Sequence, residues 1–402
     1  MRQGRSLEEA IGPAARSLKK PEDRALALAL ASETLRWLSD LDRLIDTATR
    51  QILPDDAKAR TVLRLMLVQA LRFHTPPHAI VAASLPLLTG GPRRLAHGVF
   101  GTLLRGGANL PDVPHLLPEI AERWQAQWGD AMADAARRAL ADLPPVDLQW
   151  RESACRADRD EALPGVALAP RHLRVERAGS VEGLPGFADG NWWVQDLAAS
   201  IPARLLGMGD GREVLDLCAA PGGKTMQLAD AGWHVTAVDK SKRRLDRLRD
   251  NLRRTGLAAT VIEADLLRWE PKQAADAILL DAPCSATGIF RRHPDVLYRS
   301  GPHQIAEMAD MQDQLLNRVA NWVKPGGQLV YAVCSLEREE GEARIAAFLD
   351  ADQRFVIDPV GALELPDGIS PDAEGQVRTL PGMLADCGGL DGFFAVRMIR
   401  RG

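Results

Sequence analysis

The sequence lacks the features that mark membrane, secreted and disulfide-stabilised proteins. No apolar run approaches the ~18 residues that a bilayer-spanning helix needs. The N-terminal segment, MRQGRSLEEAIGPAARSLKK, has no long apolar core, so we do not expect a secretory signal. The cysteines are odd in number and no two have C-x-x-C spacing, which predicts neither a disulfide framework nor a metal site. We expect free thiols in the reducing cytoplasm, and no membrane or metal partner. The cysteines are Cys155, Cys218, Cys284, Cys334 and Cys387.

The chain is also poor in aromatic residues and in net positive charge. Aromatic residues make up 5% of it and the formal net charge is −4. These values argue against an extended base-stacking platform and against nonspecific coating of nucleic acid. Positive charge is local instead. Residues 240–254 hold eight Lys or Arg against two Asp, a pattern typical of a solvated helix face that also fits the steering of a polyanion.

The length of 402 residues predicts two or three domains, and 46% hydrophobic and 26% charged residues are typical of a globular protein. In residues 1–141, apolar side chains recur at three- and four-residue spacing, which predicts an all-helical domain. Pro144 and Pro145 mark its end. Residues 145–200 mix short strand candidates with turns and predict a small α/β adaptor.

Residues 201–402 alternate between strand and helix patterns. Near-continuous apolar runs such as these are buried on both faces and belong to parallel sheets with crossover helices. We therefore predict a C-terminal α/β domain with a Rossmann-like, doubly wound sheet. The expected strands are 213–219, 234–239, 260–265, 276–283, 327–335 and 393–400, and the expected helices are about 223–231, 241–256, 303–323 and 337–350.

The segment LDLCAAPGGKT, residues 215–225, predicts a strand, a tight loop and a helix start. Ligands of doubly wound sheets bind at such loops, beside the free N–H groups of the helix. A phosphate-binding P-loop requires G-x-x-x-x-G-K-[ST], but Cys218 stands where the first Gly must be. The alternative is an S-adenosylmethionine pocket, which needs an acid at the second strand end for the ribose and a polar group at the third. Asp239 and Asp265 stand there.

Two cysteines are predicted at the ends of adjacent strands. Cys284 follows Asp281-Ala282-Pro283, and Cys334 lies in QLVYAVCSLE. A single thiol in such a place is usually an apolar filler. Two thiols beside a methyl-donor pocket suit covalent catalysis, because a thiolate that adds to carbon 6 of a pyrimidine makes carbon 5 nucleophilic. Asp281 is placed to hydrogen-bond the ring and stabilise the adduct.

The motifs LDLCAAPGGKT, DAPCSATG, YAVCS and DGFFAVRMIR resemble those of the RNA cytosine-C5 methyltransferase family over about residues 185–400. The resemblance implies that Cys334 is the nucleophile and that Cys284 assists product release. Val333 departs from the family's usual Thr before the nucleophile. The implied S-adenosyl-L-methionine site consists of Cys218, Ala219, Ala220, Pro221, Gly222, Gly223, Lys224, Asp239, Asp265 and Asp281.

Residues 1–141 resemble a NusB-like RNA-binding domain, a fusion typical of the family members that act on bacterial 16S ribosomal RNA. The expected function is methyl transfer to carbon 5 of a cytosine in that RNA before the ribosome is finished, by a monomer. The expected RNA contacts are Arg291, Arg292 and His293, in a basic insertion after Cys284. The alternatives are the same chemistry on transfer RNA or on another ribosomal RNA site, and a non-catalytic RNA-binding assembly factor.

Overall fold

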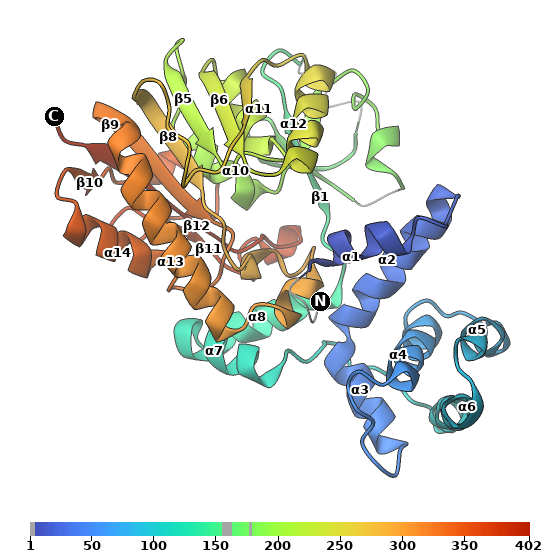
Figure 1. The fold of residues 1–402 in the computed structure, drawn as a ribbon. Coiled ribbons are helices and arrows are strands. Elements are labelled where there is room, and N and C mark those ends of the chain that lie inside the picture. The colour runs from blue at the N-terminus through green and yellow to red at the C-terminus, as the bar shows by residue number, and fades with distance from the viewer. Residues whose placement is uncertain (1–4, 155–162, 177–178) are drawn as a thin grey trace. The chain divides into compact units, whose positions relative to one another are not determined.

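The computed structural model describes residues 5–154, 163–176 and 179–402, so Cys155 lies outside the described residues. The chain forms two compact units. The first contains residues 1–143 and 290–299, and the second contains 144–289 and 300–402. The sequence-based domain limits at 141, 145 and 200 stay a prediction. Residues 290–299, expected as an insertion beside Cys284, group with the helical unit (Figure 1).

The first unit is helical, as the periodicity predicts. Prolines at the first turn start three of its helices, where a missing N–H costs no hydrogen bond. Gly129, with a φ of 80°, lies between the last two helices of the segment predicted as all-helical and separates them. The helices are α1 (Leu7–Ala14), α2 (Pro21–Arg36), α3 (Leu38–Thr47), α4 (Lys58–Leu71), α5 (Pro77–Ser84), η1 (Leu85–Leu87), α6 (Gly90–Arg105), α7 (Pro118–Trp128) and α8 (Asp130–Ala141).

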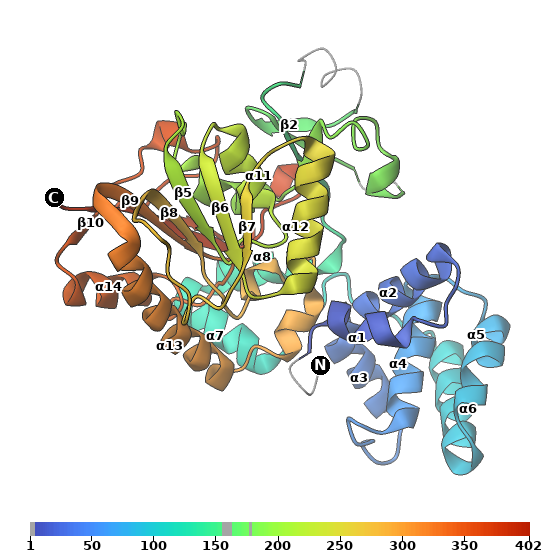
Figure 2. The same ribbon diagram turned by 45° about the horizontal axis from the view of Figure 1, so that its top comes forward.

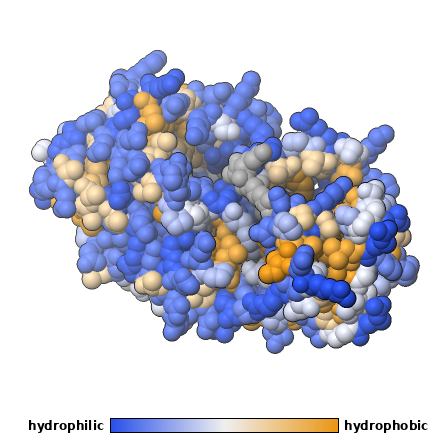
Figure 3. Space-filling model, turned by 60° about the horizontal axis from the view of Figure 1, so that its bottom comes forward, coloured by the Kyte–Doolittle hydropathy of each residue, from blue (hydrophilic) through white to orange (hydrophobic). Residues whose placement is uncertain are grey.

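The core of the helical unit forms around α4. Leu63, Met66 and Leu67 of α4 are fully buried against Leu41 and Phe100 of neighbouring helices. The same unit also exposes large apolar side chains, and Figure 3 shows apolar patches on a mainly hydrophilic face. The exposed ones in this unit are Leu26, Leu28, Ile52, Leu87, Leu95 and Leu143.

Residues 290–299 complete this helical unit. The Arg36 guanidinium donates to the carbonyl of Arg291 at 3.0 Å, and the Tyr298 hydroxyl donates to the carbonyl of Leu35 at 2.6 Å. The Phe290 ring packs 5.3 Å from the Trp124 ring, centroid to centroid. The segment, which includes the short helix η4 (Pro294–Tyr298), is therefore an ordered part of the helical unit.

The second unit begins with a four-stranded antiparallel sheet in the order β2-β3-β1-β4. Three of these strands lie in the strand candidates expected between residues 145 and 200, whereas β2, a four-residue run between Gly165 and Pro170, was missed. The chain then runs from β4 into α10, as the sequence predicted. The elements are β1 (Val146–Trp150), β2 (Val166–Ala169), β3 (His172–Val175), η2 (Val181–Gly183), β4 (Trp192–Val194) and α10 (Leu197–Arg204).

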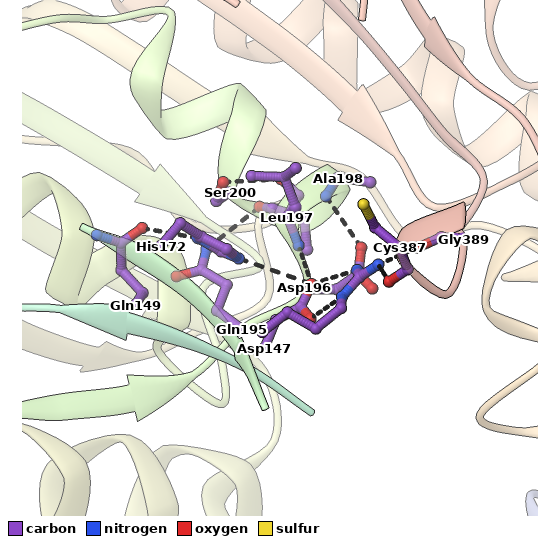
Figure 4. Close-up of polar contacts among 12 residues, drawn as sticks. Asp147, Gln149, His172, Gln195, Asp196, Leu197, Ala198, Ser200, Cys387 and Gly389 are labelled. Carbon is purple, nitrogen blue, oxygen red and sulfur yellow. Dashed lines mark hydrogen bonds and ion pairs between the residues drawn. The ribbon is translucent and has the colours of Figure 1, made fainter. Parts of the chain in front are cut away.

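A buried ion pair connects this small sheet to the rest of the second unit (Figure 4). Arg174 donates to both oxygens of Asp147, at 2.6 and 2.8 Å, and to the carbonyls of Cys387 and Gly389 at 2.7 Å each. The amide of Leu197, the first residue of α10, donates to Asp147 at 3.0 Å. Burial opposes the charge of Asp147, but the bonds from Arg174 hold its pKa well below the usual range.

The large sheet of the second unit has eight strands in the order β10-β12-β9-β8-β5-β6-β7, with β11 also paired to β12. The five neighbouring strands β9, β8, β5, β6 and β7 run parallel to one another (Figure 2). β12 pairs antiparallel with β9, β10 and β11. The expected fold class is confirmed. The elements are β5 (Glu213–Leu217), α11 (Gly223–Asp230), β6 (His234–Asp239), α12 (Lys242–Thr255), β7 (Thr260–Glu263), β8 (Ala275–Asp281), η3 (Thr287–Ile289), α13 (Pro302–Val319), η5 (Ala320–Trp322), β9 (Val323–Val333), α14 (Glu342–Ala351), β10 (Phe355–Ile357), η6 (Ala362–Glu364), β11 (Val377–Thr379), η7 (Ala385–Cys387) and β12 (Phe393–Arg400).

Helices cover both faces of the large sheet, which explains the continuous apolar runs. Leu217 of β5 packs in one core with Leu316 of α13, and Val214 packs in another with Leu228 of α11. The chain builds β5, β6 and β7 in one direction and then returns to place β8 on the other side of β5. The carboxyl ends of β5 and β8 therefore form the point where ligands of such sheets bind.

Candidate active site

The loop after β5 has the backbone shape that its glycines suggest, although only one glycine is required by the fold. Gly222 has a φ of 106°, and a Cβ there would lie 2.8 Å from Cγ of Leu248. A Cβ on Gly223 would meet Gln195 at an ordinary 3.5 Å. Cys218 also adopts a left-handed φ, 61°. The surrounding residues of the structure therefore leave room for a side chain at 223. A glycine there allows a ligand to approach the backbone closely.

Asp239 is positioned as a preorganised acceptor at the end of β6. It is 3% exposed, and the amides of Ala220 and Ser241 donate to it at 3.1 and 2.8 Å. The Arg244 guanidinium lies 3.5 Å away. A carboxylate has about four acceptor sites, so two amide donors leave capacity for hydroxyl groups. Asp265, two residues beyond β7, is exposed and accepts from the amide of Leu267 at 3.0 Å.

Lys224 and Asp281 face each other across the switch point. The Lys224 ammonium donates to the Asp281 carboxylate at 2.9 Å and lies 4.9 Å from the centre of the Phe393 ring. Lys224 is thus paired with Asp281, and Arg244 with Asp239, so each of these two cations at the rim has an acidic partner. The structure thus places Asp239 and Asp281 against the glycine loop, through the Ala220 amide and Lys224, while Asp265 lies two residues beyond β7.

The two strand-end thiols lie side by side. The sulfur atoms of Cys284 and Cys334 are 3.5 Å apart, although 50 residues separate them in the chain. The hydrogen bond between the thiols, together with burial, raises the pKa of the Cys284 thiol well above its usual value. Cys284 therefore remains protonated at neutral pH. Val333, which replaces the Thr expected before Cys334, is fully buried in the apolar core, where it needs no polar partner.

Backbone contacts connect the loops that carry the thiols. The Gly288 amide donates to the Cys334 carbonyl at 3.0 Å, and the Gly392 amide donates to the Gly288 carbonyl at 2.8 Å. A Cβ on Gly288 would lie 1.9 Å from the Gly392 carbonyl oxygen. Glycine is thus required at 288 because the start of the DGFF segment passes directly against it.

Sequence reasoning missed a buried polar cluster next to the thiols. Ser285 and Ser335, the residues that follow Cys284 and Cys334, both donate hydroxyl hydrogen bonds to Glu340. All three side chains are fully buried. Glu340 lies in the charged segment EREEGE, which resembles an exposed helix start, so only the cysteine–serine repetition hinted at a shared environment.

The basic segments differ from the expectations in detail. Arg291 is 2% exposed, because it packs within the helical unit, and it is therefore not available to bind RNA phosphates at the surface. Arg292 is half-buried and His293 is exposed. In the run 240–254, Arg249 and Arg253 pair with acids one helical turn away, as expected for a solvated face.

The fold and the site define the class of protein. A doubly wound sheet with a glycine loop after its first strand, and acids after the next strands, is the arrangement of S-adenosylmethionine-dependent methyltransferases. The residues fit this cofactor, because Asp239 has acceptor capacity left for the ribose hydroxyls and both nearby cations, Lys224 and Arg244, are paired with acids. Part of the chain matches the model for "16S rRNA methyltransferase RsmB/F" over residues 203–399, and residues 1–89 match the NusB family.

The chain belongs to the RsmB/F family of methyltransferases. It is 34% identical to the ribosomal RNA small subunit methyltransferase B of Salmonella arizonae, over 99% of this chain and 95% of the relative. A methyltransferase homolog protein from Pyrococcus horikoshii has 26% identity and a TM-score of 0.59, covering 75% of this chain and 98% of its own. NSun6 from the same organism, solved with SFG, has 19% identity and a TM-score of 0.62, covering 71% and 99%, and shows the shared fold.

Proposed function

We propose that this protein transfers a methyl group from S-adenosylmethionine to carbon 5 of a cytosine in 16S ribosomal RNA, through a covalent bond between Cys334 and carbon 6. The observation that carries the proposal is the pair of thiols 3.5 Å apart, at the ends of the two strands beside the donor loop. Family membership and the name of the Salmonella relative support an RNA of the small ribosomal subunit as the substrate.

S-adenosylmethionine, when bound, supplies a methyl group on a positively charged sulfur. Asp239 holds acceptor sites toward the ribose hydroxyls, and we assign Asp265 to the adenine. Gly222 allows the left-handed turn of the loop, and Gly223 keeps the loop open to the cofactor. The Lys224–Asp281 pair borders this loop and leaves no uncompensated cation beside the sulfonium.

Cys334 begins the reaction as a thiolate. Its sulfur forms a bond to carbon 6, and the electron pair of the C5–C6 double bond moves to carbon 5. Asp281 hydrogen-bonds the polar edge of the ring and stabilises the adduct. Carbon 5 then forms its bond to the methyl group while the bond from that methyl to the sulfonium breaks.

Product release requires the reverse of the first step. A water molecule takes the carbon-5 proton, the electron pair of that C–H bond re-forms the C5–C6 double bond, and the C6–S bond breaks so that the Cys334 sulfur leaves as a thiolate. We assign Cys284 to this release. The hydrogen bond with Cys334, together with burial, raises the pKa of the Cys284 thiol, which argues against Cys284 as the attacking thiolate.

Exchange of each thiol tests these roles. Cys284→Ala should accumulate a covalent RNA–protein complex, seen as a slow band in a denaturing gel, because addition proceeds while release fails. Cys334→Ala should abolish both the complex and methylation. An adduct in Cys334→Ala together with none in Cys284→Ala would mean that the roles are reversed.

The choice of substrate is tested by bisulfite mapping of ribosomal RNA from cells with and without the gene. If one cytosine of 16S RNA resists bisulfite conversion only in cells that have the gene, the proposal is supported. The same difference in transfer RNA or at another ribosomal RNA site points to that alternative. An unchanged map in cells that produce the protein leaves the non-catalytic assembly role. Ribosomal RNA is made and modified in the bacterial cytoplasm, which we therefore propose as the location.

Arg292 and His293 remain the proposed RNA contacts of the segment after the thiol loop. The Arg292 side chain is half-buried and the His293 side chain is exposed, whereas Arg291 is buried. Arg292→Ala/His293→Ala should weaken RNA binding and make it less dependent on salt, since a lost phosphate contact releases fewer counterions. Unchanged affinity and unchanged salt dependence would remove the segment from the RNA site.

A further inference from the structure

A buried carboxylate lies between the two loops that carry the thiols. Glu340 belongs to the segment between β9 and α14 and is 0% exposed. One of its oxygens accepts from the amide of Ser285 at 2.7 Å, and the other accepts from the hydroxyls of Ser285 and Ser335. These two serines directly follow Cys284 and Cys334 in the chain. Glu340 is thus bonded to the neighbour of each thiol.

The hydrogen bonds of Glu340 fill its acceptor capacity. The amide group of Gln312 donates to it at 3.2 Å, which makes four donors for about four acceptor sites. Burial raises the pKa of Glu340, and these bonds oppose that rise. A carboxylate saturated by the protein has no acceptor site left for a substrate or a catalytic water. Its role is therefore exerted through the residues that it binds.

Weaker contacts join the same loops. The hydroxyls of Ser285 and Ser335 are 3.2 Å apart, and those of Thr287 and Ser335 are 3.3 Å apart. Hydrogen bonds to an ionised group are roughly twice as strong as such neutral contacts. The Glu340 side chain is thus the strongest polar connection between the two loops.

We propose that Glu340 is the positioning residue of the thiol pair. By holding Ser285 and Ser335 together, it fixes the sulfur of Cys284 beside that of Cys334, at a separation where both reach one pyrimidine ring. This inference rests on the proposed function. It adds that the two thiols act at the correct spacing only while this carboxylate connects their loops.

Steady-state kinetics of Glu340 variants test the proposal. Glu340→Ala should lower kcat by about 100-fold, the cost of a misplacement near 1 Å, while KM for S-adenosylmethionine stays unchanged. Glu340→Asp should also be slow, because the shorter side chain cannot reach both serines. Glu340→Gln keeps the length, and serine hydroxyls can turn to accept from its amide, so it should recover most of kcat. Glu339→Gln, an exchange at the exposed neighbour, is the matched control and should be fully active.

Thiol spacing can be measured without catalysis. Phenylarsine oxide binds two thiols that lie close together, so the full-length wild type should bind it tightly and Cys284→Ser should not. We expect Glu340→Ala and Glu340→Asp to lose this tight binding and Glu340→Gln to retain it. Unchanged kcat and unchanged arsenical binding in Glu340→Asp would overturn the proposal, as would an Asp variant more active than the Gln variant.

Two results separate this inference from the function on which it rests. If the wild type methylates no RNA but arsenical binding of the Glu340 variants follows the expected order, the proposed function fails and the positioning role stands. If every Glu340 variant methylates RNA and binds the arsenical as the wild type does, the positioning role fails and the function stands. Should Glu340→Ala not fold, as judged by its melting temperature, the Asp and Gln variants decide.

Discussion

Asp216 is a buried carboxylate beneath the donor loop whose ionisation the fold opposes. It lies in β5 and is 0% exposed, and the Thr225 hydroxyl donates to one of its oxygens. Its other oxygen has no hydrogen-bond partner among the described residues. Burial raises its pKa to about 7, from an ordinary value of 3.8. The folded state holds the proton of this carboxyl more tightly than the unfolded state does. The resulting stabilisation is fully present below about pH 4 and is lost as the pH rises through about 7.

Asp216→Asn should therefore change how stability depends on pH. The amide still accepts from Thr225 and never ionises, so the variant should gain stability relative to the wild type as the pH rises from about 4 to about 7, with no further change above that. The difference is on the order of 4 kcal/mol at most, from a shift of about three pKa units. Melting temperatures of both proteins across this range measure it. A difference that stays constant with pH would contradict the assignment.

Gly288→Ala tests the close approach of the DGFF segment. The added Cβ would lie 1.9 Å from the Gly392 carbonyl, so the loops must separate. We expect destabilisation of about 3 kcal/mol or more and loss of RNA adduct formation. Gly98→Ala in α6 is the matched control, because a Cβ there meets nothing within 4 Å. It should stabilise the protein by about 0.5–1 kcal/mol in urea unfolding.

Single residues of the site were predictable where a reactive side chain follows directly on an apolar run that predicts a strand. Cys284, Cys334 and Asp239 lie at or next to strand ends, so the apolar runs before them located them in advance. Glu340 was not predictable, because its partner Ser285 is 55 residues away and its charged neighbours indicate an exposed surface. The burial of Arg291 is likewise a tertiary property, set by packing in the helical unit.

At the scale of elements, the longer strands of the large sheet were predicted well and its three-residue strands were missed. β6 and β12 match the expected ranges because their runs are continuous and end at charged residues. β10 and β11, with three residues each, were missed, since three residues carry no measurable periodicity. Their strand form depends on pairing with β12.

The Asp147–Arg174 pair supports a prediction at this scale. Arg174→Met leaves a buried carboxylate without its cation, which should destabilise the protein by about 3–5 kcal/mol in urea unfolding. The double variant Asp147→Leu/Arg174→Met removes the unpaired buried charge and should recover much of the lost stability. A single variant as stable as the wild type would show that the pair does not secure the small sheet to α10.

At the scale of the whole molecule, charge is distributed unevenly between the parts of an acidic chain. Residues 57–111 contain seven Lys or Arg and no Asp or Glu. Arg60 and Arg64 are held by acids of other segments in the helical unit, whereas Arg93 and Arg94 of α6 are exposed. The exposed arginines of α6 are suited to the RNA-binding role that the sequence predicts for the helical unit.

Arg93→Ala/Arg94→Ala should therefore weaken RNA binding and make the slope of log affinity against log salt shallower by about 1–2. Fluorescence anisotropy with a 16S RNA fragment at several salt concentrations measures both. Arg249→Ala/Arg253→Ala is the matched control, because those arginines pair with acids on α12, and it should have little effect. Equal losses in both double variants would indicate only a general effect of charge.

The membership of residues 290–299 in the helical unit has a consequence for biosynthesis. The first helices leave the ribosome early, yet the segment that receives the hydrogen bond from Arg36 is translated only after most of the parallel sheet has been made. At usual elongation rates this delay is on the order of ten seconds. The nascent helical unit passes that time without one of its parts, so chaperone contact and protease sensitivity should be greatest in this interval.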